Sequence, residues 1–254
     1  MIETYIFQHA LGEFARIKRL FGWFLLVAVL YLLAGLFSAT LKKADPAAVY
    51  GQMVLAMAYH ILPLVAAVYA TAIVSAEVEQ KTIVYLLTRP IPRWKLLLFR
   101  TLAAILVVFA ITMAAVSILA LSSGQLGSAA YMRDVLGVFV GSCAYVSFFL
   151  LISLVSNRAM LFCMLYAFAW ETAMPNIPGD LYHLSIYSYL RAIGDHVVPQ
   201  RGGGIISVLS GQNAQSTLTP SGSFIAMILF SVVCVGISLW WFSHFEYVAR
   251  EDAE

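Results

Sequence analysis

The sequence has little charge, which limits what kind of protein it encodes. Only 11% of its 254 residues are Asp, Glu, Lys or Arg, whereas about a quarter of a soluble chain is normally charged. Hydrophobic residues make up 62%, and the mean hydropathy is +0.88. This composition excludes an ordinary soluble domain, and the length leaves no room for a sizeable soluble enzyme domain beside a membrane domain. The net charge of +2 is too small to indicate a nucleic-acid partner.

Cysteine is also scarce, and its positions exclude a disulfide-stapled extracellular fold. The three cysteines, Cys143, Cys163 and Cys234, all lie inside apolar runs, where they are expected to act as small buried hydrophobes. The first apolar run, 20–41, is longer than the roughly 7–15-residue core of a signal peptide. We therefore expect this run to be retained as the first span.

Sequence motifs for chemistry are missing. The three glycines at 202–204 are followed by Ile and Ser, so they do not form a G-x-x-x-x-G-K-[ST] phosphate loop. No H-E-x-x-H motif occurs, and the five histidines are scattered over different segments, which argues against a metal cluster. Glu77 and Glu79 are two residues apart and point to different sides of a helix, so they do not form a protease-like acid pair. We expect no catalytic residue, no bound metal and no cofactor on this chain.

What the sequence does contain is long apolar runs, each near the roughly 20 residues that a helix needs to span a membrane. The runs are continuous rather than alternating, which predicts helices and not a barrel. The sequence predicts an all-α polytopic membrane protein forming one transmembrane domain over 1–254. Its six expected spans are 20–41, 52–76, 96–122, 135–156, 159–174 and 222–245.

The fifth expected span is the weakest of the six. Its clean apolar part runs from Ala159 to Trp170, where Glu171 interrupts it, and Pro175 and Pro178 follow. We expect a short, broken span. Glu171 is the one acid inside an expected span, and a buried ionisable residue is a functional candidate by default. The alternative is that the span is short enough for Glu171 to reach the outer interface.

Residues 1–19 are helix-like but too polar to span. Apolar residues recur at three- and four-residue steps, and polar ones take the other side. This pattern predicts an interfacial helix lying on the membrane, with an extension of the first span into water as the alternative. The recurring apolar residues are Ile2, Ile6, Ala10, Phe14 and Ile17.

The distribution of Lys and Arg predicts the orientation. With the N-terminus inside, the inner segments hold ten of them and the outer segments hold five. The positive-inside bias therefore predicts a six-span, N-in/C-in topology with both termini in the cytoplasm.

The outer connections differ in length. The segments 42–51 and 123–134 are expected to be short links, whereas 175–221 is too long to be only a connector. Its first part, 181–198, offers an apolar side and predicts a re-entrant or interfacial helix, because the fifth span is short. Its second part, 202–223, is rich in Gly, Ser, Gln, Asn and Thr and is expected to be flexible.

The stretch between the second and third spans, 75–100, is the one densely charged segment. It holds five of the fifteen basic residues, namely Lys81, Arg89, Arg93, Lys95 and Arg100, with Glu77 and Glu79 at its entrance. Thr82 can cap a short helix on which Ile83, Leu86 and Leu87 form an apolar ridge. Pro90 then ends the helix.

Two interpretations of this stretch are open. A basic cytoplasmic loop can simply set topology. An apolar ridge on a capped helix that ends at a Pro-x-Pro break is more than topology needs, and such a ridge is what a groove in a partner binds.

Three motifs in this stretch resemble the signature of ABC-2 type transporter permeases, which reads E-x-E-x-x-T, then L-L-x-x-P, then R-x-x-x-x-K/R. Here they are Glu77-Val-Glu79-Gln80-Lys81-Thr82, then Leu86-Leu87-Thr88-Arg89-Pro90, then Arg93-Trp94-Lys95 with Arg100 beyond. The close match covers about 20 residues. The six spans and the long outer loop are similar to that family over the whole chain, and Glu171 in a short fifth span also resembles it.

The resemblance implies the membrane subunit of an ATP-driven transporter, with export as the expected direction. The helix 82–89 would be the coupling helix, docked into a separate ATP-binding subunit. The implied docking residues are Glu77, Glu79, Thr82, Ile83, Leu86, Leu87, Arg89, Pro90, Arg93 and Lys95. ATP and Mg²⁺ would be bound by two such partner subunits, not by this chain.

The resemblance also implies that two permease chains form the pathway, as a homodimer or with a related permease. The implied location is the plasma membrane, the inner membrane in bacteria, and an accessory periplasmic or extracellular protein is compatible with it.

Two other functions stay open. One is a secondary transporter or channel working alone, for which only Glu171 offers an ion site. The other is a membrane scaffold without transport. Nothing in the spans predicts a polar cage, which slightly favours a hydrophobic or amphipathic cargo.

Overall fold

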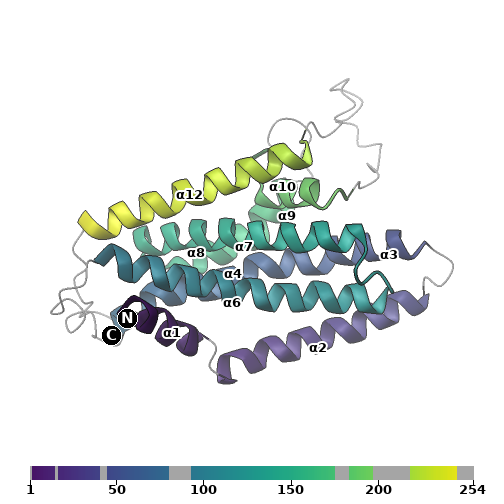
Figure 1. Cartoon of the computed structure of the whole chain (residues 1–254), viewed down its shortest axis with the longest axis horizontal. Coiled ribbons are helices and arrows are strands. Elements are labelled where there is room, and N and C mark those ends of the chain that lie inside the picture. The colour runs from purple at the N-terminus through teal and green to yellow at the C-terminus, as the bar shows by residue number, and fades with distance from the viewer. Residues whose placement is uncertain are drawn as a thin grey trace.

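The computed structural model describes residues 2–14, 17–40, 45–79, 93–174, 183–196 and 218–244, and they form a bundle of helices (Figure 1). Within these ranges all regular structure is helical. Four helices are long and apolar enough to cross a membrane, at Pro46–Ile73, Trp94–Ser122, Ala129–Val155 and Pro220–His244. The predicted all-α membrane class is confirmed, and these helices coincide with the second, third, fourth and sixth expected spans.

The helix of the second span starts earlier than the sequence predicts. Asp45 accepts a hydrogen bond from the Ala47 amide, and Pro46 occupies the first helical turn, where its missing N–H costs nothing. The helix continues through α3 (Pro46–Met53), a π-helical segment (Val54–Ala58) and α4 (Tyr59–Glu79). The prediction of a link over 42–51 is therefore wrong from Pro46 onward.

The third and fourth spans form a hairpin whose turn is shorter than predicted. α6 (Arg93–Ser122) and α7 (Ala129–Val155) are joined by a turn in which Gly124 and Gly127 have φ of 69° and 81°. These left-handed conformations suit glycine. Ser128 then caps α7 by accepting from the Tyr131 amide at 3.1 Å. The link predicted over 123–134 therefore ends at Ser128, and its last six positions are helical.

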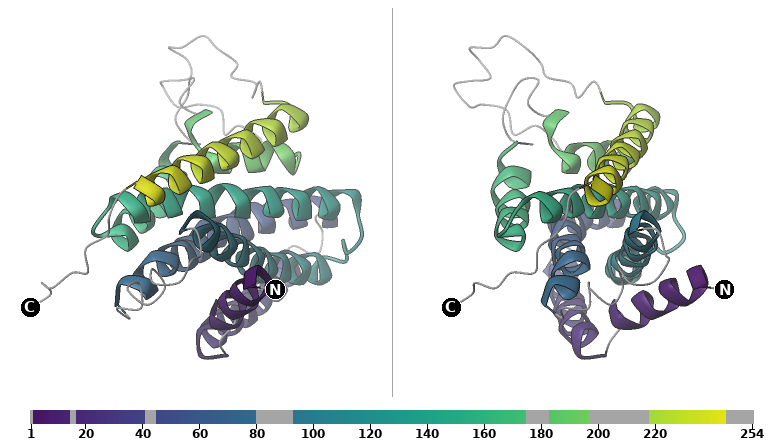
Figure 2. Two further views of the ribbon diagram at one scale, coloured as in Figure 1. Left: turned by 60° about the vertical axis from the view of Figure 1, so that its left-hand side comes forward. Right: turned by 90° about the vertical axis from the view of Figure 1, so that its left-hand side faces the viewer.

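The helix α7 lies at the centre of the bundle, packed against α4 and α6 on one side and α12 (Pro220–His244) on the other (Figure 2). Two glycines one turn apart, Gly137 and Gly141, allow close packing on this helix, as small residues spaced by four do between membrane helices. A Cβ on Gly141 would lie 2.6 Å from Leu62 Cδ2 of α4. The glycine pair therefore sets how closely α4 approaches α7.

The N-terminal helices pack against α6. In α1 (Ile2–Phe14), Ala10 and Phe14 are buried, on the side that the sequence pattern predicts to be apolar. The Phe14 ring meets Tyr69 of α4 edge-on, with centroids 5.9 Å apart. α2 (Ile17–Thr40) contacts α6 and exposes many large apolar side chains. The expected first span falls on α2.

The expected fifth span is helical throughout, although it is short. It consists of α8 (Ala159–Leu165), a π-helical segment (Tyr166–Trp170) and α9 (Glu171–Ala173). Glu171 therefore does not end the helix. The helix changes from π-helical to α-helical hydrogen bonding at that residue. After a range outside the described residues, α10 (Ile186–Ile193) lies within the range 181–198, where the sequence predicts a helix.

We expect the change Gly141→Ala to destabilise the bundle by about 1–3 kcal/mol, since overpacking a dense core forces side chains off their rotamers. The added Cβ would lie 2.6 Å from Leu62 Cδ2 and 2.9 Å from Leu190 Cδ2, and both leucines are fully buried. Denaturant unfolding of the purified protein in detergent measures the change.

The matched control for this test is Gly236→Ala in α12, where a Cβ meets nothing within 4 Å. Alanine in a helix interior is favoured over glycine, so this variant should be neutral or slightly more stable. Equal behaviour of the two variants would contradict the close approach of α4 to α7.

Candidate functional site

The predicted docking segment is framed by two helices that lie side by side. α4 ends at Glu79 and α6 begins at Arg93, both at the end of the bundle where α1 packs (Figure 1). The predicted docking residues Thr82, Ile83, Leu86, Leu87, Arg89 and Pro90 lie outside the described residues, as do the side chains of Glu77, Glu79 and Arg93. Their roles stay predictions.

Of the predicted docking residues, Lys95 is the one whose side chain is described. Its ammonium lies 5.6 Å from the centroid of the Trp94 ring, a cation–π distance. Trp94 is exposed, at the first turn of α6. An exposed Trp beside a Lys at a helix end is typical of a membrane–water interface.

Arg100 ties three helices together close to this frame. Its guanidinium lies 3.6 Å from the Glu13 carboxylate of α1 and donates to the Ile73 carbonyl of α4 at 3.5 Å. Both partners of the ion pair are largely buried, so solvent screens it less than a surface pair. The helices that flank the docking segment are thus fixed to each other and to α1.

Glu171 lies away from this end and is almost completely buried, at 2% exposed. Its Oε2 accepts from the Ser185 hydroxyl at 2.7 Å and from the Tyr187 amide at 3.0 Å, and its Oε1 accepts from the Ile186 amide at 3.3 Å. These donors belong to the first turn of α10. Glu171 therefore caps α10, and a negative charge at that position also suits the helix dipole.

Both π-helical segments contact α10 or the turn that leads into it. Tyr187 of α10 donates to the Leu55 carbonyl in the segment Val54–Ala58 at 3.3 Å. Trp170, at the end of the segment Tyr166–Trp170, donates to the Leu184 carbonyl at 3.2 Å. A π-helical turn disturbs the regular i→i−4 hydrogen bonds of the backbone. It can therefore offer to neighbouring helices carbonyls and side chains that a regular helix would keep bonded or turned away.

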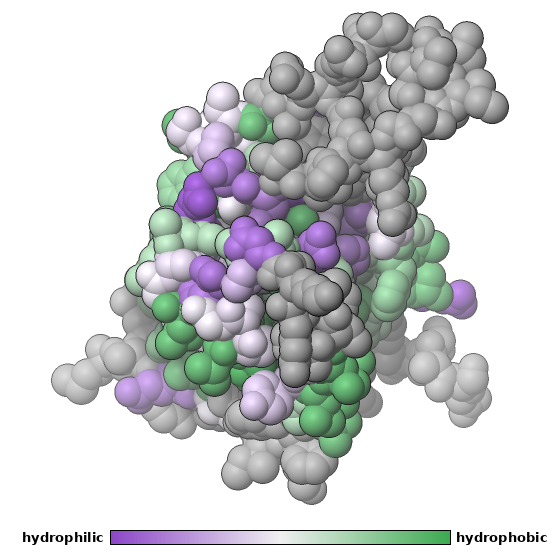
Figure 3. Space-filling view, turned by 90° about the vertical axis from the view of Figure 1, so that its right-hand side faces the viewer, coloured by the Kyte–Doolittle hydropathy of each residue, from purple (hydrophilic) through white to green (hydrophobic). Residues whose placement is uncertain are grey.

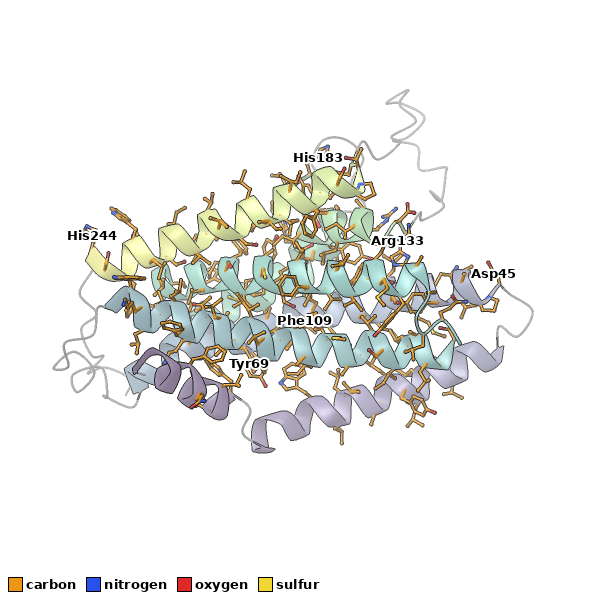
Figure 4. The ribbon with its side chains drawn as sticks, viewed as in Figure 1. Asp45, Tyr69, Phe109, Arg133, His183 and His244 are labelled. Carbon is orange, nitrogen blue, oxygen red and sulfur yellow. The ribbon has the colours of Figure 1, made fainter. Side chains whose placement is uncertain are left out.

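The other end of α10 is held by a second buried acid, Asp134 of α7. Its Oδ1 accepts from the Tyr59 hydroxyl at 2.6 Å and lies 2.7 Å from His196 Nε2, which donates in the tautomer that carries a proton there. The residues next in sequence form a second, exposed pair, Arg133 with Asp195 at 2.6 Å. Figure 4 shows Arg133 at the same end of the bundle as Asp45 and opposite His244.

Sequence reasoning missed Asp134 and His196. Asp134 falls in the segment 123–134, where the sequence predicts a link, and His196 is one of five histidines scattered over the chain. The sequence holds one indication of this contact. The dipeptide Arg133-Asp134 is complementary in charge to Asp195-His196, since each cation can face an acid. No group of three His, Cys, Asp or Glu side chains within the described ranges is arranged to hold a metal ion.

We expect Glu171→Leu to cost about 2–4 kcal/mol of stability, because it leaves the Ser185 hydroxyl and two amides buried without their acceptor. Glu171→Gln keeps one acceptor and should cost less, about 1–2 kcal/mol. Denaturant unfolding in detergent measures both. The control is Thr172→Val, whose exposed hydroxyl bonds to its own helix. A neutral Glu171→Leu would mean that Glu171 is solvated at the interface.

Comparison with known proteins agrees with the resemblance found in the motifs. A family model described as an ABC-2 family transporter protein matches residues 11–175, which is more than half of the chain. The match includes α4, α6, α7 and the segment between α4 and α6. No curated protein is similar enough to the sequence to count as a match. The chain belongs to the ABC-2 family of transporter membrane proteins.

Proposed function

We propose that this chain is the permease subunit of an ATP-driven exporter, coupled to two separate ATP-binding subunits that bind ATP and Mg²⁺. Two permease chains, identical or related, form the pathway between them. The observation that carries the proposal is the family match, which includes the two long helices that flank the motif-bearing segment. An accessory protein outside the membrane is compatible with this assembly.

The proposed topology has six spans with both termini in the cytoplasm of a plasma or bacterial inner membrane. α2 is 24 residues long, or about 36 Å at 1.5 Å per residue, which suffices for a first span. The segment Ala159–Ala173 is shorter than a full span, and α10 is docked beside it. The Lys and Arg asymmetry supports the orientation, with the docking segment inside.

The geometry offers a route from the docking segment to the rest of the bundle. α6 is 30 residues long, about 45 Å, and runs unbroken from Arg93, after the docking segment, to Ser122. Arg100 ties its first turns to α4 and α1, so a push on the segment between α4 and α6 would move these helices together. We propose Ile83 to Thr88 as the point of contact, with Glu77 and Glu79 at its entrance.

A stand-alone secondary transporter fits less well, for a specific reason. It needs ionisable groups that can exchange ions within the spans. The described spans bury two acids, Asp134 and Glu171, and both are hydrogen-bonded to α10 or to the residues that follow it. Their present partners are structural, which favours an energy source outside this chain.

We expect Leu86→Asp and Leu87→Asp each to lower co-purification of the ATP-binding subunit at least about tenfold, because a charge on the apolar ridge cannot enter a desolvated groove. The measurement is vanadate-sensitive ATPase activity that co-purifies with the tagged chain from native membranes. The matched control is Leu126→Asp, an exposed leucine in the turn between α6 and α7 that should leave the activity unchanged.

Two results would contradict the proposal. If Leu86→Asp and Leu87→Asp leave the co-purifying activity intact, the docking segment is wrong. If no ATPase activity co-purifies with the unaltered chain, the ATP-driven class is wrong, and a secondary transporter or a scaffold takes its place.

A further inference from the structure

Two successive residues of α7 pair with two successive residues that follow α10. Arg133 pairs with Asp195, and Asp134 pairs with His196. We name these four residues the α7–α10 clamp. The first pair is exposed, with side chains 46% and 52% accessible, whereas the second is buried, with His196 at 9% and Asp134 at 0%. The clamp therefore has an outer pair that water reaches and an inner pair that it does not.

The backbone at the end of α10 is built for this pairing. Asp195 adopts φ of 56°, a left-handed conformation that ends the helix and turns the chain back. Gly194 lets the backbone pass directly over the cluster, since a Cβ there would lie 2.7 Å from Asp134 Oδ1 and from Tyr59 Oη. The turn thus directs His196 inward to Asp134 and Asp195 outward to Arg133.

The two buried acids that hold α10 differ in how many hydrogen bonds tie them to it. Glu171 accepts three, all from residues 185–187 at the start of α10. Asp134 Oδ1 accepts one from His196, after α10, and one from Tyr59 of α4. The Tyr50 hydroxyl also interacts with the Asp134 carboxylate.

This difference decides which end of α10 releases more readily. Moving α10 away from Glu171 would break that carboxylate's hydrogen bonds to Ser185, Ile186 and Tyr187. Moving the other end away from Asp134 breaks the one to His196, and the carboxylate keeps Tyr59. The neighbouring Arg133–Asp195 pair is exposed, on the end of the bundle where hydrophilic side chains gather (Figure 3). Release at the clamp therefore breaks fewer buried hydrogen bonds to α10 and its flanks than release at Glu171.

We propose that the α7–α10 clamp is a releasable closure, with α10 pivoting about its Glu171-capped end when the clamp opens. If the proposed function is right, this opening belongs to the transport cycle, on the side of the bundle opposite the docking segment; this last step rests on that proposal. The clamp is a positioning device and contacts no cargo. Its release would expose the face of α10 that packs against Gly137 and Gly141 of α7.

The reporter for this test is Ile193→Cys, at the clamp end of α10, in the full-length chain with Cys143, Cys163 and Cys234 replaced by Ala. Ile193 is buried while α10 is docked, at 6% exposed. The reaction rate with a charged, membrane-impermeant methanethiosulfonate, measured in proteoliposomes without nucleotide, reports how often α10 opens. A second reporter, Ser238→Cys in α12, is also buried and reports loss of the whole bundle.

We expect Asp134→Ala and His196→Ala to raise the Ile193→Cys reaction rate at least about tenfold, because each breaks the buried pair. The matched control Arg133→Ala breaks only the exposed pair and should change the rate less than about threefold. If Ser238→Cys also reacts faster in these variants, the milder changes Tyr59→Phe and Gly194→Ala are tested instead, and both should raise only the Ile193→Cys rate. Unchanged Ile193→Cys rates in Asp134→Ala, His196→Ala, Tyr59→Phe and Gly194→Ala would overturn the proposal.

A cross-link tests whether the opening belongs to the cycle. In the same cysteine-free background, Arg133→Cys with Asp195→Cys is joined by a short bifunctional thiosulfonate in the purified complex with its ATPase. We expect vanadate-sensitive ATP hydrolysis to fall at least about fivefold and to recover on reduction. The reason is that a cycle that needs the clamp to open cannot turn over while the cross-link keeps it closed. Hydrolysis that the cross-link leaves unchanged would remove the clamp from the cycle without touching the coupling proposal, which the Leu86 and Leu87 variants test separately.

Discussion

Two carboxylates, those of Asp134 and Glu171, are buried inside an apolar helical bundle, and the arrangement of α10 depends on satisfying them. An unpaired acid in such surroundings costs at least a few kcal/mol, so each needs donors that the spanning helices cannot supply from their own bonded backbones. The eight-residue helix α10 supplies them. Its free amides satisfy Glu171, and the turn that follows it brings His196 to Asp134. In return the two acids fix a helix too short to be stable alone.

At the opposite end of the bundle, among the residues that the structure describes, Arg100 joins α1, α4 and α6 near the segment that carries the family motifs. Long uninterrupted helices connect this end with the α10 end, and α4 contributes to both, through the Ile73 carbonyl at one end and Tyr59 at the other. A movement of α4 driven at one end would therefore reach Asp134, the acid that the hydrogen bond from His196 joins to the end of α10.

The sequence predicts the helices of this fold well and their contacts poorly. Apolar runs locate the four helices that are long and apolar enough to cross a membrane, because length and continuity decide whether a helix can do so. Two helices begin at Pro46 and Ala129, before the starts at 52 and 135 that the apolar runs predict. Their caps, Asp45 and Ser128, lie within stretches whose composition looks like that of a link. Glu171 could be singled out as the only acid in an expected span. Its partners could not, because they lie on a helix reached through a long connection. Asp134 and His196 are 62 residues apart, and only the fold brings them together. The docking segment was found by its motifs, and its roles stay predictions.

Amide hydrogen exchange of α10 shows whether this short helix is fixed to the bundle by a buried acid at each end. In the full chain without nucleotide, we expect the amides of Leu190 and Ile193 to exchange together, at least about a hundredfold more slowly than in an unstructured peptide. Their protection should fall short of that in the centre of α7, because α10 opens without unfolding the bundle. Exchange of these amides at the rate of an unstructured peptide would mean that the two acids do not hold α10 on the bundle.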